Sequence, residues 1–360
     1  MRFSLYVAFR FRCFKHELTL LLQQLSQLLL WLLVFLGPAL AALVFTIFLA
    51  LGLLYQTDTP ARQQILLCWA LLCGQSLLIG LYRDAIIGSR YLLFLQSLAP
   101  SKSQRRTADL LLLFCSQPIL MCHLLMLSMA NFSQWPGVLP QLFLLPLQWL
   151  YAVTLLYCGS RVLVILALNL PLLLILAPTS LAGGLVLLAC GLVLALVWPG
   201  NAMRCHFRTT SPLRFWLRLW LNQTQQLLSR ILLLLLVLTL ALISIKQRPD
   251  LSAGIALLCG LLLLLISCSM QLSNNKFINM YAMFFRQYPP QLCHWQFLAP
   301  LLLAAVSISL LCLLTLQWPL SWKFLPALVI CLGVARYQPQ WFIAGWLAGS
   351  AISSGLFIFS

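Results

Sequence analysis

Acidic residues are almost absent from this 360-residue chain, in which five Asp and Glu accompany 22 Lys and Arg. Only 8% of the residues are charged and 62% are hydrophobic, whereas about 25% are charged in a typical soluble domain. This composition excludes an ordinary soluble protein and predicts one that crosses a membrane several times. The net charge of +17 would suit nucleic acid, but no soluble basic domain exists to hold it. We therefore expect no nucleic-acid partner.

Nucleotide-binding and catalytic signatures are also missing. A phosphate-binding loop needs a Gly-rich turn followed by Gly-Lys-Ser/Thr, and no lysine of the chain has that context. The five acids are scattered and offer no paired carboxylates for acid–base catalysis. The 13 cysteines include no CxxC pair and lie mostly in apolar runs, as packing residues do. We expect neither an enzyme nor a cofactor in this chain, so ATP that drives it would bind a partner.

Apolar runs of transmembrane length fill most of the sequence. A helix is the expected conformation of each run, because unpaired backbone amides are too costly in lipid. We predict an all-α polytopic membrane protein with about eleven spans (10–12), the count being open at 162–198. The predicted spans are 28–54, 65–82, 109–130, 139–159, 162–178, 181–198, 229–245, 253–272, 297–316, 324–336 and 341–358.

The distribution of basic residues predicts the orientation. With a cytoplasmic N-terminus, all but four of the 22 Lys and Arg fall on the cytoplasmic side. The four exceptions are Arg62, Lys246, Arg248 and Lys323. This asymmetry indicates a multi-pass protein of the bacterial inner (plasma) membrane.

Two amphipathic stretches suggest an internal repeat. Residues 9–27 (FRFRCFKHELTLLLQQLSQ) and 213–230 each have one polar and one apolar helical face and lead into a span. The match continues, since QQLSQLLLWLL at 23–33 resembles QQLLSRILLLLL at 225–236. We predict two pseudo-repeated transmembrane halves, 1–200 and 201–360, each entered through an interfacial elbow helix.

A proline-bearing cytoplasmic loop follows the second span of each half, at 83–108 and at 273–296. The first contains SLAPSKSQRRTAD, in which basic residues directly follow a proline. Any cytoplasmic loop tends to be basic, so a topology signal and a docking segment are both consistent with this pattern. The residues expected to dock a partner are Pro100, Ser101, Lys102, Arg105, Arg106, Arg286 and Pro289.

An elbow helix, two spans and a loop of the form L-x-P-S-K-x-x-R-R together resemble the permease subunit of ABC-2-type exporters. In that family the loop between the second and third spans carries a coupling helix that docks on an ATPase subunit. The resemblance implies a fused permease with two halves, energised by separate cytosolic ATP-binding subunits. The apolar interior suits a hydrophobic or amphipathic cargo, which the sequence does not identify. The second loop departs from the pattern, because it lacks the SKxxRR charges.

The span 109–130 holds a histidine, which is costly in a membrane and usually faces the protein interior. We expect His123 to bond a neighbouring helix or to line the cargo path. Its soft neighbours Cys115, Met121, Cys122, Met126 and Met129 leave a metal role open, although helical packing explains their spacing equally well. The alternative to a permease is a polytopic protein that does not transport, either an assembly scaffold or an enzyme acting on lipids or glycans.

Overall fold

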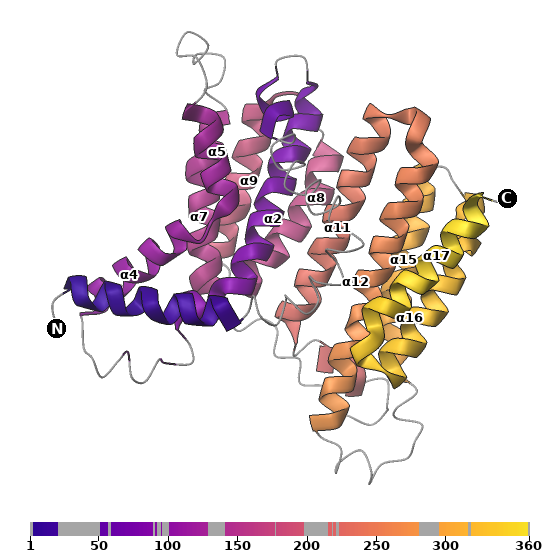
Figure 1. Cartoon of the computed structure of the whole chain (residues 1–360). Helices are drawn as coiled ribbons and strands as arrows, with labels where there is room; N and C mark the ends of the chain where they lie inside the picture. Colours follow the sequence, from indigo (N-terminus) through magenta and orange to yellow (C-terminus); the bar gives the residue numbers. More distant parts are fainter. Residues whose placement is uncertain are drawn as a thin grey trace. The chain divides into compact units, whose positions relative to one another are not determined.

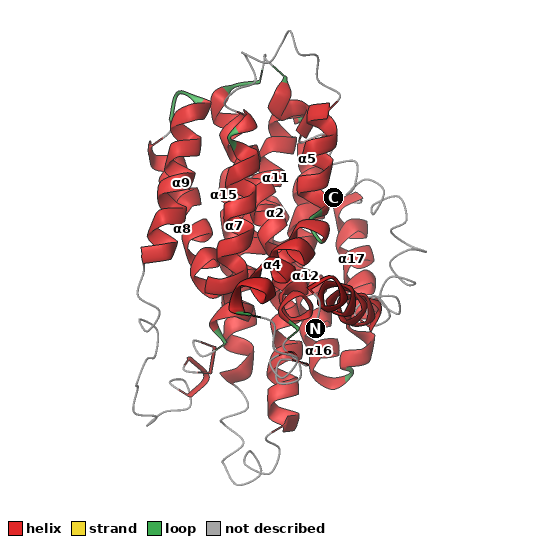
Figure 2. Cartoon of the chain, turned by 90° about the vertical axis from the view of Figure 1, so that its left-hand side faces the viewer, coloured by secondary structure: helices red, strands yellow, loops and turns green. Residues whose placement is uncertain are grey.

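The structure is a computed structural model that describes residues 3–20, 51–56, 59–88, 91, 95, 101–128, 141–176, 178–197, 215–217, 219–220, 223–280, 295–315 and 318–358. These residues form helices and short connections, with no β-strand among them, so the predicted all-α class is confirmed (Figure 2). The chain divides into two compact units, Met1–Pro199 and Gly200–Ser360.

Several helices have the length and composition of membrane spans. Four qualify within the described part of the chain, or five if one bent helix pair counts as a single span. The four are Ala61–Ile87, Thr224–Gln247, Pro249–Met280 and Trp295–Thr315. A membrane-embedded protein is therefore supported, whereas eleven spans stay a prediction. Several predicted spans are helices of only 13 to 17 residues, and most of 28–54 lies outside the described residues.

The first unit is built around the helix α2 (Ala61–Ile87), which packs against α7 (Leu144–Cys158), α8 (Ser160–Leu176) and α9 (Leu181–Val197) (Figure 1). Two side chains of α2 fasten these helices through backbone carbonyls. The Trp69 indole donates to the carbonyl of Leu166 in α8 at 2.8 Å. The Arg83 guanidinium donates to the carbonyl of Leu156, in the last turn of α7, at 3.0 Å.

The predicted span 109–130 is not one continuous helix. The structure has two helices there, α4 (Lys102–Cys115) and α5 (Pro118–Ser128), which meet at an angle of 66°. The cause is Pro118, because a proline disfavours helical backbone in the residue before it and takes the first position of a new helix readily. The break leaves Gln117 between the two helices, at the edge of the unit's interior.

The second unit has α12 (Ser252–Met280) at its centre, packed against α11 (Thr224–Gln247), α15 (Leu298–Thr315) and α16 (Leu325–Tyr337). The last helix, α17 (Phe342–Ile358), packs closely on α16. The connections include the 3₁₀ turns η3 (Pro249–Leu251), η4 (Trp295–Phe297), η5 (Trp318–Phe324) and η6 (Pro339–Trp341).

Two contacts of the second unit parallel those of the first. The Trp346 indole of α17 donates to the carbonyl of Leu261 in α12 at 2.9 Å. The Asn275 amide of α12 donates to the carbonyl of Ala335, near the end of α16, at 2.5 Å. In each unit, therefore, the long central helix caps the C-terminal end of a helix that then turns into its neighbour.

Candidate functional site

The N-terminal segment is helical over residues 3–20 and so begins earlier than the predicted elbow 9–27, of which 21–27 lie outside the described residues. Figure 1 shows this helix (indigo) running crosswise to α2 and α7, beside the start of α4. Its inner face carries Tyr6, Arg10 and Phe14, spaced four residues apart, and all three are buried. Arg12 and Lys15 are exposed on the opposite side.

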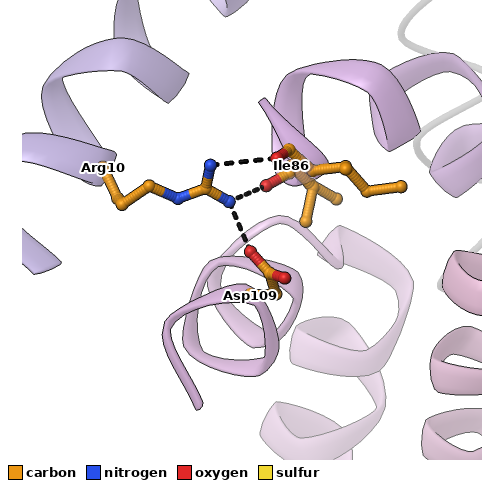
Figure 3. A network of polar contacts seen from close by, with 4 residues as sticks. Arg10, Ile86 and Asp109 are labelled. Atoms are coloured by element: carbon orange, nitrogen blue, oxygen red, sulfur yellow. Dashed lines mark hydrogen bonds and ion pairs between the residues drawn. The ribbon is translucent and has the colours of Figure 1, made fainter. Parts of the chain in front are cut away.

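Arg10 joins three elements at one point (Figure 3). Its guanidinium donates to the carbonyls of Ile87 at 2.9 Å and Ile86 at 2.5 Å, which end α2, and forms an ion pair with Asp109 of α4. Arg10 is 2% exposed and Asp109 is 6% exposed. The arginine satisfies carbonyls that have no partner within α2, and its charge suits the negative end of that helix. We call this group, Arg10 with Ile86, Ile87 and Asp109, the Arg10 clasp.

The Arg10 clasp adds to two expectations from the sequence. Arg10, expected in the elbow helix 9–27, is buried rather than at a water-exposed surface. Asp109, expected at the start of a span, lies inside α4, which begins seven residues earlier at Lys102. A signal was present, since an acid beside an apolar run of a membrane protein needs a partner. The identity of that partner was not readable, because Arg10 is 99 residues away.

Gly88 completes the clasp. It ends α2 in the left-handed conformation, with φ of +67°, and its amide donates to the carbonyl of Asp84 at 2.9 Å. A Cβ atom on this residue would collide with the Arg10 guanidinium and would lie 2.9 Å from the Leu95 side chain. Only glycine combines this backbone with the close approach of the arginine.

Apolar contacts reinforce the clasp. Tyr6, Leu95 and Ala108 form a buried cluster that joins the N-terminal helix to α4. Burial raises the pKa of the Tyr6 hydroxyl, and the nearby Arg10 charge only partly opposes this shift, so the phenol stays neutral near pH 7. The N-terminal helix and the start of α4 therefore form one packed surface.

The predicted docking loop 83–108 contains the first turns of α4. Ser101 caps this helix reciprocally with Gln104, and Lys102 and Arg106 are exposed whereas Arg105 is half-buried. None of the three cations forms an ion pair within the described part of the chain. Lys102 is the first residue of α4, where a cation opposes the helix dipole by about 0.3–1 kcal/mol. Arg105 lies four residues before Asp109 in the same helix, and its positive charge favours the ionised carboxylate. Pro100 lies outside the described residues.

The described part of the corresponding loop in the second unit, 273–296, has no cluster of three cations like Lys102, Arg105 and Arg106. Arg286 and Pro289 lie outside the described residues, as does most of the loop 273–296. The second predicted elbow, 213–230, is helical where it is described, and its Trp216 and Trp220 are buried. The Trp220 indole donates to the Asn274 side chain of α12 at 3.2 Å.

Amide side chains, joined by Arg336, hold this end of the second unit together without an ion pair among the described residues. Gln271 donates to Gln296 at 3.0 Å, and Asn274 donates to the carbonyl of Gln296 at 2.8 Å. Asn275 accepts from Arg336 at 3.3 Å in addition to its bond to α16. We call Gln271, Asn274, Asn275 and Gln296 the asparagine network.

His123 is fully buried in α5. Its Nε2 lies 2.6 Å from the Tyr55 hydroxyl and its Nδ1 lies 3.0 Å from Gln148 Oε1 in α7. Both ring nitrogens are thus engaged by protein groups, as expected of a histidine that bonds a neighbouring helix. The described residues contain no group of three or more His, Cys, Asp or Glu that could hold a metal ion, and Met129 lies outside them. A role of His123 in a cargo path stays a prediction.

Comparison with known proteins ends at the family level. No curated protein matches the chain, and no solved structure does. One family model matches residues 4–356, from the N-terminal helix to the last turns of α17, and thus spans both units. The chain belongs to this family, which is described as a family of unknown function (DUF6136).

Proposed function

We propose that the chain is the transmembrane permease of an ATP-driven exporter, energised by separate cytosolic ATP-binding subunits that dock on the start of α4. The observation that carries this proposal is the construction of that surface. Lys102, Arg105 and Arg106 gather in the first turns of α4 and form no ion pair among the described residues, and the Arg10 clasp fixes their helix to the rest of the unit. Basic residues of this kind, on a firmly anchored element, suit an external acidic partner.

The anchoring gives the surface a way to transmit force. A partner that pulls on α4 also pulls on the N-terminal helix and on the end of α2, because Arg10 holds all three. The break between α4 and α5 would let α4 tilt while α5 stays packed against the rest of the unit. A docking segment on an isolated loop would have no such connection.

The proposal includes two halves of related design in one chain, and about eleven spans with a cytoplasmic N-terminus. The parallel capping contacts, Arg83 to Leu156 and Asn275 to Ala335, support related halves. A chain with both halves would need ATP-binding subunits but no second permease.

The test is affinity purification of the full chain from its native membrane in mild detergent, followed by mass spectrometry. We expect an ATP-binding subunit to co-purify with the wild type and to be lost from the variant with Lys102, Arg105 and Arg106 changed to Ala. If each charge contributes about 0.5 kcal/mol, the triple change weakens docking roughly tenfold.

The matched control changes Arg62, Lys246 and Arg248 to Ala. These three exposed cations belong to the predicted outer side. Both triple variants lose three positive charges, so the two variants differ only in where the charges are lost. The control should retain the partner. Loss of the partner from both variants would refute specific docking at α4, and absence of any ATP-binding subunit from the wild type would refute the permease.

A further inference from the structure

Four polar side chains lie together where α4 and α5 break, and we call Gln75, Gln117, His123 and Gln148 the break cluster. They come from α2, the link between α4 and α5, α5 itself, and α7. Gln75 donates to Gln117 Oε1 at 2.6 Å and to the carbonyl of Gln148 at 3.1 Å, and Gln148 contacts His123. None of the four is more than 2% exposed. The first unit therefore has a contiguous polar interior.

The hydrogen bonds fix which atoms of Gln75 and Gln117 donate. Gln75 must present its Nε2 to the carbonyl of Gln148, and the same nitrogen then requires Oε1 of Gln117 as acceptor. Gln148 Oε1 lies 3.0 Å from His123 Nδ1, and the Tyr55 hydroxyl lies 2.6 Å from His123 Nε2, so the tautomer of the ring decides which of its nitrogens donates. The amides of Gln75 and Gln117 cannot be turned without breaking the bonds that they make.

Three buried atoms of the cluster are left without a partner among the described residues. They are Gln75 Oε1, Gln117 Nε2 and Gln148 Nε2. Leaving a buried polar atom unpaired costs about 1–3 kcal/mol, and such atoms are rare in folded proteins. The bonds of Gln75 and Gln117 make the unpaired Gln117 Nε2 a donor and the unpaired Gln75 Oε1 an acceptor. A hydroxyl group complements such a pair, because its oxygen accepts a hydrogen bond and its proton donates one.

We propose that the break cluster binds one neutral hydroxyl group. No charged side chain contacts the cluster in the described residues, and an unpaired charge there would carry a large desolvation cost, so an ion is disfavoured. Water fits, since buried water makes about three hydrogen bonds to otherwise unpaired groups. The hydroxyl of a polar solute has the same chemistry. Interrupted helices in membrane transporters commonly border the substrate site.

The assignment of this hydroxyl to a cargo rests on the proposed function, whereas its presence at the break does not. The inference also narrows the expected hydrophobic or amphipathic cargo to one that carries at least one neutral hydroxyl. A cargo of that kind would pass the first unit where α5 begins. Water would occupy the same place in the resting protein.

Radiolytic hydroxyl-radical labelling of the purified full chain tests the site, because bound water generates radicals beside it. Oxidation of the buried His123 is read by mass spectrometry as a ratio to oxidation of the exposed Tyr337. We expect His123 to be labelled well above background. The variant Gln75→Leu with Gln117→Leu should reduce the ratio several-fold, because both sides of the site become apolar.

The control is Gln64→Leu, which removes a buried glutamine of the same helix that bonds the carbonyl of Gln56 at 3.2 Å, outside the cluster. It should leave the ratio unchanged. Background labelling of His123 in the wild type overturns the proposal even if the double variant fails to fold. An unchanged ratio in a folded double variant overturns it as well.

Added glycerol separates the two sources of the hydroxyl. A fall of the ratio in the wild type shows that a solute hydroxyl displaces the water, whereas a constant ratio shows that water alone is bound; either result supports a hydroxyl site. The measurement needs no ATP-binding subunit. Its outcome is therefore independent of whether the permease proposal holds.

Discussion

The two units fasten corresponding ends with different chemistry. In the first unit a buried ion pair, Arg10 with Asp109, joins the N-terminal helix to α2 and α4. In the second unit the asparagine network joins α12, η4 and α16 through amides and carbonyls. A buried ion pair is intolerant of losing one partner, whereas an amide network loses its bonds one at a time. The first unit is thus built to keep three elements in a single arrangement.

The sharpest test of this contrast is Asp109→Ala, which leaves the Arg10 charge buried and unpaired. We expect the first unit to lose about 3–5 kcal/mol of stability. Thermal unfolding of the purified chain in mild detergent, with trypsin resistance of the N-terminal helix, measures the loss. The double variant Arg10→Met with Asp109→Leu should recover most of it, because no charge remains to be buried. A single variant as stable as the wild type would contradict a buried ion pair.

The corresponding change in the second unit is Asn275→Ala. It removes the amide that caps α16 and leaves the carbonyl of Ala335 unpaired, which should cost about 1–3 kcal/mol. The same unfolding measurement applies. A loss as large as that of Asp109→Ala would remove the distinction between the two units.

Gly88→Ala should have the smallest of the three effects. The left-handed backbone costs a non-glycine residue about 1–2 kcal/mol, and the added methyl group presses on the Arg10 side chain. The matched control is Gly254→Ala in α12, where an added Cβ meets nothing within 4 Å and should stabilise the helix by about 0.4–1 kcal/mol. Opposite signs of the two shifts in melting temperature are expected, and equal shifts would argue against the clasp.

Helix positions were the most predictable part of the fold. The apolar runs 65–82 and 229–245 correspond to α2 and α11. A long apolar run in lipid forms a helix because its backbone amides must be hydrogen-bonded within the segment. The break at Pro118 was missed although the residue was visible, because hydropathy averages over it. The break also places Gln117 beside a buried partner, Gln75 of α2, and this contact cannot be inferred from the local sequence.

The candidate site was predictable only in its exposed half. The basic start of α4 was found because charges outside a membrane stand out in the sequence. The buried half was not, since the elbow pattern gave no sign that Arg10 is buried and hydropathy gave the scattered glutamines no weight. The partners of these residues are 25 to 99 residues away in the sequence, and no local pattern identifies them.

The separation of Arg10 from Asp109 imposes an order on biosynthesis. The carbonyls of Ile86 and Ile87 emerge from the ribosome before Asp109 does, so the guanidinium meets the end of α2 first. Arg10 and Asp109 are 99 residues apart in the sequence. At a synthesis rate of about 5–20 residues per second, Asp109 is made roughly 5–20 s after Arg10. The Arg10 clasp can therefore close once α4 (Lys102–Cys115) is made, before α5, α7, α8 and α9 are synthesised.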